Sequence, residues 1–184
     1  DRVVENIKCV TISVTEIQDR VTVENIELMH ELYGLNRHVV IMVAHTGSWE
    51  FGGYKASAIL KHKVYGIVSL VKNQRFNHLI QSTRGKMGMY LVTMQDAKQL
   101  FESEFKQPSA FIFIADQSPS NPAAAHWVNF MNRETAFFTG GERFARQHNA
   151  AVVFVNMVQQ SRGHYLIKLI EITRTPNAES FGSI

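Results

Sequence analysis

The sequence has a single cysteine, Cys9, among its 184 residues. One thiol cannot form a disulfide within the chain and cannot supply a cysteine cluster for a metal ion. The sequence therefore favours a reducing compartment, or a thiol that serves only as a small core residue. No apolar run approaches the about 18 residues of a membrane span, and no signal peptide is visible.

Neither sign of charge dominates the composition. Lys plus Arg number 19 and Asp plus Glu number 16, so the formal net charge is only +3. This small excess gives no support for nucleic-acid binding, but it permits a local basic patch facing an anionic ligand or a membrane surface. The length is sufficient for one domain with a sizeable core, over residues 1–184. Because the chain does not begin with Met, we expect it to be a piece of a longer protein.

Several catalytic motifs are missing. The sequence contains no G-x-S-x-G elbow, which argues against a serine hydrolase of that class. It contains no H-E-x-x-H motif, no Walker loop and no G-x-G-x-x-G, so zinc-protease chemistry and nucleotide binding have no support. We accordingly predict no metal site and no cofactor.

Short β-rich apolar runs alternate with longer amphipathic runs along the chain. We predict strands over 7–14, 39–44, 64–71, 90–94, 110–115, 150–158 and 164–173, and helices over 23–34, 48–62, 75–88, 96–106 and 140–149. This alternation predicts an α/β fold with a mostly parallel central sheet flanked by helices. The stretch 116–138 is predicted to be irregular, which makes it either functional or the place of a missed element. The tail after residue 173 is polar and is predicted to be loose.

Polar residues follow two of the predicted apolar strands. His45 comes directly after 39–44, and Asp116 and Gln117 come after 110–115. In open α/β sheets, ligands bind beyond the carboxyl ends of the strands. The competing interpretation is that polar residues at strand ends need no functional explanation, because loops are generally polar.

The spacing of His45 and Glu50 sets a geometric condition. Residues i and i+5 of a regular helix lie about 140° apart, so the pair can meet only if Glu50 lies in the first helical turn and His45 precedes it. Gly47 permits that sharp turn. A carboxylate on one imidazole nitrogen would make the other nitrogen a better base, able to deprotonate a substrate hydroxyl. With eight histidines and 16 acids in the chain, the bare spacing is close to chance, so its context matters more.

Basic residues gather at Lys72, Arg75, Arg84 and Lys86. They could bind a phosphate group or an acidic carrier protein. The alternative for Arg75 is a solvated helix face. The sequence alone leaves both interpretations open.

Two further features precede the last predicted helix. Thr139 and Gly140 begin it, and its free N–H groups could bind an anion or simply be capped. An apolar cluster lies before them in the irregular stretch. Its members are Trp127, Phe130, Met131, Phe137 and Phe138. They could wall a groove for an acyl chain, touch a membrane or pack in the core.

Taken in order, these blocks resemble a known family from about residue 21 to residue 172. "HTGSWE" (45–50) is similar to the His-Leu-Gly-Asn-Trp-Glu block of bacterial lipid A biosynthesis acyltransferases, the lauroyl/myristoyl transferases of the lysophospholipid acyltransferase-like superfamily. "VSLVKNQRFNHLIQSTRGKMG" (68–88) resembles the family's Lys/Ser-Asn-Pro block followed by Arg-x-x-x-Gly. "FIFIADQSP" (111–119) resembles its strand ending in Asp-Gln, and residues 128–155 resemble its Thr-Gly block. The sequence departs from the pattern at Thr46, Ser48, Gln74 and Asn132, which leaves the acceptor open.

The resemblance implies a glycerolipid acyltransferase-like fold and an acyl-transfer site. His45 would be the general base, Glu50 would orient it, and Arg84 would bind an acceptor phosphate. The substrate-binding candidates are completed by Lys72, Asn73, Asp116, Gln117, Thr139 and Gly140. The donor would be an acyl-acyl carrier protein or acyl-CoA, and the acceptor a hydroxyl or amine of a membrane lipid such as a lipid A precursor. The resemblance also implies that the longer protein is membrane-anchored. It places this reaction at the cytoplasmic face of the inner membrane, with the piece itself soluble.

Two other functions remain compatible with the sequence. A thioesterase or other hydrolase would use the same base to activate water, and would consume the thioester without an acceptor. A non-catalytic module would bind a lipid or an acyl carrier without turnover. Dependence of turnover on an acceptor separates the three.

Overall fold

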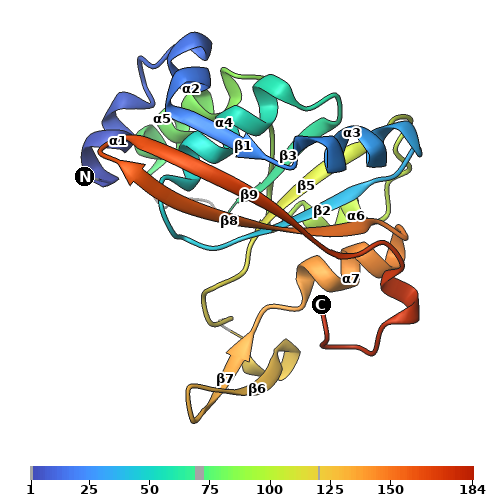
Figure 1. The fold of residues 1–184 in the computed structure, drawn as a ribbon. Helices are drawn as coiled ribbons and strands as arrows, with labels where there is room; N and C mark the ends of the chain where they lie inside the picture. Colours follow the sequence, from blue (N-terminus) through green and yellow to red (C-terminus); the bar gives the residue numbers. More distant parts are fainter. Residues whose placement is uncertain (1, 69–72, 120) are drawn as a thin grey trace.

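A seven-stranded sheet forms the centre of the computed structural model, which describes residues 2–68, 73–119 and 121–184 (Figure 1). Across the sheet the strands are β1 (Val21–Glu24), β9 (His164–Thr173), β8 (Ala151–Ser161), β2 (Val39–Val43), β5 (Ser109–Ile114), β3 (Lys63–Val68) and β4 (Tyr90–Thr93). Neighbouring strands are parallel except β8 and β9, which are antiparallel. The predicted α/β fold with a mostly parallel sheet is confirmed.

The helices lie around this sheet. They are α1 (Arg2–Lys8), α2 (Val14–Arg20), α3 (Ile26–Gly34), α4 (Trp49–Ile59), α5 (Gln74–Gly85), α6 (Ala97–Phe101) and α7 (Gly140–Gln147), with 3₁₀ turns at Pro122–Ala124 and Pro176–Ala178. The five predicted helices are present with shifted ends, and 96–106 shortens to the five residues of α6. In the described part of the chain, no helix combines the length and the apolar character needed to cross a membrane.

The central strands are buried on both faces, which explains their uninterrupted apolar sequences. Val39 and Val40, neighbours on β2, are both fully buried but belong to different clusters. The cluster of Val39 contains Phe51 of α4, and that of Val40 contains Phe144 of α7. Because successive side chains of a strand point to opposite faces, α4 and α7 cover opposite faces of the sheet.

The prediction for the amino-terminal segment is wrong. The predicted strand 7–14 is the end of α1, a turn and the beginning of α2, whose N-cap Ser13 forms a capping box with Glu16. Cys9 lies in that turn and is buried in the core, where burial raises its pKa to about 11. The strand β1 was missed because its pairing with β9 joins residues more than 140 positions apart.

The stretch 116–138 is not irregular throughout. It contains a two-stranded hairpin, β6 (His126–Phe130) and β7 (Arg133–Phe137), which projects away from the central sheet (Figure 1). Met131 and Asn132 join the strands, both with positive φ, of 53° and 61°. These are the backbone angles of a tight hairpin turn. The turn has no glycine, the residue that usually indicates such a turn in a sequence, so the hairpin was not predicted.

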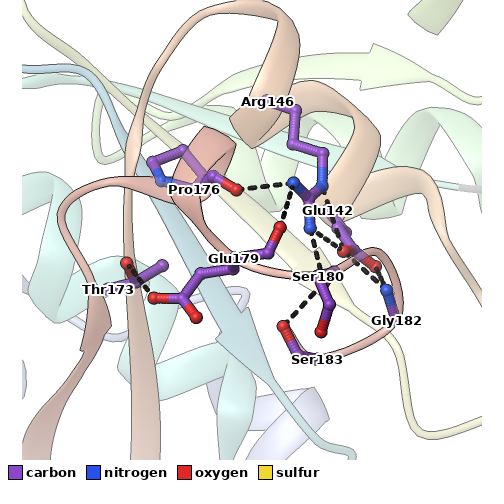
Figure 2. Close-up of polar contacts among 8 residues, drawn as sticks. All are labelled: Glu142, Arg146, Thr173, Pro176, Glu179, Ser180, Gly182 and Ser183. Carbon is purple, nitrogen blue, oxygen red and sulfur yellow. Dashed lines mark hydrogen bonds and ion pairs between the residues drawn. The ribbon is translucent and has the colours of Figure 1, made fainter.

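The carboxyl-terminal tail is not loose, contrary to the prediction. Arg146 of α7 donates hydrogen bonds to three carbonyls of the tail, those of Pro176 (2.6 Å), Glu179 (2.9 Å) and Ser180 (2.7 Å). The carboxylate of Glu142, one turn earlier, pairs with Arg146 at 2.7 Å and accepts from the N–H of Gly182 (Figure 2). These contacts fasten the tail to α7.

Replacement of Arg146 by alanine is expected to lower the free energy of unfolding by about 3 kcal/mol, because it leaves the Glu142 carboxylate buried without its cation. The Glu142 side chain is only 4% exposed. Urea denaturation measures the loss, and limited proteolysis is expected to cut the released tail. Arg143→Ala, an exposed change on the same helix, is the control and is expected to have little effect. A midpoint for Arg146→Ala equal to that of the control would contradict a fastening role.

Candidate functional site

The site is built on two neighbouring parallel strands. β2 and β5 pair in register up to Val43 and Ile114, so the residues that follow leave the same edge of the sheet. His45 and Asp116 meet there, although 71 positions separate them. The imidazole Nδ1 of His45 lies 2.6 Å from Oδ1 of Asp116, and the His45 backbone N–H donates to Oδ2 at 2.8 Å. One carboxylate therefore fixes both the backbone and the ring of the histidine.

This contact determines how the imidazole can react. Burial disfavours the charged form of Asp116, but hydrogen bonds from the His45 ring and backbone outweigh it and lower the pKa of the carboxyl. The carboxylate is therefore ionised at neutral pH and can only accept hydrogen bonds. The proton of a neutral imidazole is then held on Nδ1, which leaves the lone pair of Nε2 available as a base.

Glu50 does not hold Nδ1 of His45, so the predicted dyad is corrected. Glu50 lies in the first turn of α4, as predicted, and Gly47 makes the turn before it with φ of 58°. The Glu50 carboxylate, however, accepts a forked pair of hydrogen bonds from Arg84, at 2.6 Å from Nη2 and 3.0 Å from Nε. The reason is that α5 brings a guanidinium to this carboxylate, while β5 brings Asp116 to the histidine.

Trp49 touches both pairs, although no sequence pattern singled it out. Its ring meets the His45 ring edge-on, with centroids 5.6 Å apart. The Arg84 guanidinium lies over it, 4.9 Å from the centroid. An aromatic residue directly before Glu50 in the quoted block was the signal that could have identified it. The four polar side chains and this ring form one connected site.

An apolar cavity lies beside the site, between α4 and the sheet. Its apolar side chains come from helices α3 and α4, several strands and the segment before β4, and include Ile26, Met29, Ile41, Ile59, Leu60, Met89, Ile112, Val155, Met157 and Leu169. Ala44 and Thr46, on either side of His45, also line it, as do Glu50 and Arg84. The polar side chains of the site thus lie at the end of the cavity that is next to His45. An apolar chain could extend from there into the core.

Two of the predicted binding residues, Asn73 and Gln117, lie in loops. Lys72 lies outside the described residues. Asn73 is exposed and directly precedes α5, where its carbonyl accepts the N–H of Asn77. Gln117 is exposed beside Asp116. Neither Asn73 nor Gln117 is among the described residues that line the cavity.

Thr139 and Gly140 begin α7, as predicted. Thr139 occupies the N-cap position, but its hydroxyl donates to the carbonyl of Ala124 at 3.2 Å instead of capping the helix. Both residues are absent from the described cavity lining. In the described ranges, no group of three or more His, Cys, Asp or Glu side chains is placed to hold a metal ion.

Comparison with known proteins adds one finding. A profile of the family described as "Bacterial lipid A biosynthesis acyltransferase" matches residues 2–179. This match covers the whole central sheet, the site and the hairpin. A search of proteins with curated functions gives no match.

Proposed function

Because the chain belongs to the family of bacterial lipid A biosynthesis acyltransferases, we propose that it moves a fatty acyl chain from an acyl thioester to a membrane lipid. The acceptor is a hydroxyl, or an amine, of a lipid such as a lipid A precursor. His45 is the general base, and Asp116 is its orienting carboxylate. The observation that carries this proposal is the double contact of Asp116 with the ring and the backbone of His45.

The proposed reaction uses Nε2 of His45 twice. It first removes the proton of the acceptor hydroxyl, whose oxygen attacks the thioester carbonyl carbon and forms a C–O bond. The carbon–sulfur bond then breaks, and the leaving thiolate takes the proton back from the imidazolium. The ionised Asp116 stabilises the imidazolium between these steps, as the carboxylate of a catalytic triad does.

The surroundings of His45 suit the two substrates. The apolar cavity that Ala44 and Thr46 line would take the acyl chain of the donor, with its carbonyl near the imidazole. Arg84 is the candidate for an acceptor phosphate, because Glu50 engages its Nε and Nη2 and so fixes its orientation. Lys72, Asn73, Gln117, Thr139 and Gly140 stay predictions, as do the carrier of the donor and a location at the cytoplasmic face of the inner membrane.

A direct assay tests the proposal against its two alternatives. The purified chain is supplied with an acyl-carrier-protein or acyl-CoA thioester, with and without a lipid A precursor in detergent. We expect release of free thiol only with the acceptor, together with one added acyl chain in the mass spectrum of the lipid. Thiol release without acceptor would identify a thioesterase, and binding of both substrates without turnover would identify a non-catalytic module.

A further inference from the structure

The β6–β7 hairpin carries large apolar side chains in water. Trp127 is 52% exposed, Phe130 is 54% exposed and Met131, in the turn, is 82% exposed. None of them is among the described residues of the cavity lining. Core packing is thus wrong for these three side chains, and the described cavity does not use them as a wall. Contact with a membrane is the role that their exposure favours.

The tip of the hairpin combines apolar and cationic character. Phe130 and Arg133 are directly opposite in the strand register, so their side chains share one face. The exposed Met131 and Asn132 continue the tip beyond this pair. Aromatic and apolar side chains beside an arginine are typical of segments that lie at the boundary between lipid tails and headgroups.

The body of the protein holds the hairpin at its base. The indole N–H of Trp127 donates to the carbonyl of Pro122 at 3.3 Å, and the ring of Phe181 meets that of His126 edge-on. Gly182, fastened by Glu142, is so close to His126 that an added Cβ would lie 2.3 Å from its ring. The tail therefore supports the base and leaves the tip outward.

The hairpin also belongs to the edge of the sheet that holds the site. The chain leaves the carboxyl end of β5 at Ile114 and begins the hairpin at His126, so only a short connection that includes Asp116 separates them (Figure 1). A lipid acceptor must bring its reacting group to His45 while its acyl chains stay in the bilayer. A membrane contact on this edge would keep the distance between the bilayer surface and His45 short.

We propose that the hairpin tip inserts into the surface of a lipid bilayer, with Phe130 and Met131 among the upper acyl chains and Arg133 at the anionic headgroups. A protein partner is a poorer fit. Aromatic side chains bury about 150–250 Å² each, so the half-exposed Trp127 and Phe130 together with Met131 offer well under the about 800 Å² that each partner of a stable complex contributes. A bilayer needs no such area, because a few inserted side chains suffice for reversible binding. The identity of the lipid acceptor rests on the proposed function, but the bilayer contact does not.

The test is co-sedimentation of the 184-residue chain with vesicles of phosphatidylcholine, alone and mixed with phosphatidylglycerol. We expect binding that is stronger to the anionic mixture, and a loss of roughly tenfold or more when Phe130→Asp and Met131→Asp are combined. Arg133→Gln is expected to reduce binding to the anionic vesicles only. The matched control is Leu35→Asp, since Leu35 is 57% exposed at the far end of α3. Equal binding by the tip variant, or an equal loss in the control, would overturn the proposal.

Tryptophan fluorescence locates the contact. The chain has two tryptophans, and we expect vesicles with brominated acyl chains to quench Trp127. Quenching that persists unchanged in Trp127→Phe would overturn the assignment, as would a tip-dependent dimer that forms without vesicles and does not bind them. Because these measurements contain no donor or acceptor, they succeed or fail independently of acyl transfer. With a detergent-dissolved acceptor, the tip variant is expected to keep the wild-type rate.

Discussion

Replacement of Asp116 by asparagine is expected to lower kcat for acyl transfer by roughly 10²–10⁴-fold. An asparagine amide can present an N–H to Nδ1 of His45, which favours the proton on Nε2 and removes the base. It also removes the negative charge that stabilises the imidazolium. Removal of the imidazole itself, in His45→Ala, is expected to cost a similar factor. The two effects are not expected to multiply, because both changes disable the same proton transfer.

The matched change at the second carboxylate separates the two roles. Glu50→Gln weakens the forked pair with Arg84, so it is expected to raise the KM for a phosphorylated acceptor more than it lowers kcat. Asp96→Asn is the control, because Asp96 is exposed and bonds to Thr93 away from the site. Steady-state kinetics over a range of pH provides the measurement. A collapse of kcat in Glu50→Gln with a mild effect in Asp116→Asn would restore Glu50 as the partner of the histidine.

The sequence predicts the parts of this site that depend on local pattern. The apolar runs of β2 and β5 identify buried parallel strands, and this places His45 and Asp116 at strand ends. Gly47 and the helix beginning at Trp49 follow from the same local signals. Confirmation of the α/β fold rests on these elements.

The pairing of the side chains could not be predicted in the same way. Distance along the chain favours Glu50 as the partner of His45, but the adjacency of β2 and β5 supplies a carboxylate 71 positions away. No sequence pattern connects Arg84 to Glu50. The Arg84 guanidinium nevertheless pairs with the Glu50 carboxylate, which is the acid nearer to His45 along the chain. Which carboxylate contacts His45 depends on the order of the strands in the sheet. Hydrophobic periodicity along the sequence does not predict that order.

The missed elements share that cause. β1 depends on β9, and the tail depends on Arg146, so each is stabilised by distant residues and not by its own sequence. The hairpin is local but is closed by Met131 and Asn132 without glycine. A hydrophobic sequence pattern identifies helices and strands that bury an apolar face of their own. It does not identify segments whose structure depends on contacts with residues far away in the chain.

The second large effect is expected in the choice of acyl chain. Met89 lies on the cavity wall between α4 and β3, where two glycines make room for it. A Cβ on Gly53 would lie 2.7 Å from the Met89 methyl carbon, and one on Gly66 would lie 2.8 Å from its sulfur. The width of the cavity at this point is therefore set by one flexible side chain.

Truncation of that side chain, in Met89→Ala, is expected to shift the kcat/KM ratio toward longer or bulkier acyl donors by roughly 10-fold to 100-fold, since each methylene of fit is worth about 1–3 kcal/mol. Gly53→Ala is expected to push Met89 into the cavity and shift the ratio toward shorter donors. Competition between thioesters of two chain lengths, read by mass spectrometry of the lipid product, measures both. Met89→Leu, which conserves volume, is the control for lost stability.

A double variant tests whether Gly53→Ala acts through Met89. If Gly53→Ala acts by displacing Met89, it loses most of its effect when Met89 is already alanine, because the new methyl group then has no side chain to move. An unchanged effect of Gly53→Ala in the Met89→Ala background would contradict this wall, and would mean that α4 itself has shifted. A chain-length preference that stays unchanged in both Met89→Ala and Gly53→Ala would instead show that the acyl chain does not enter this cavity.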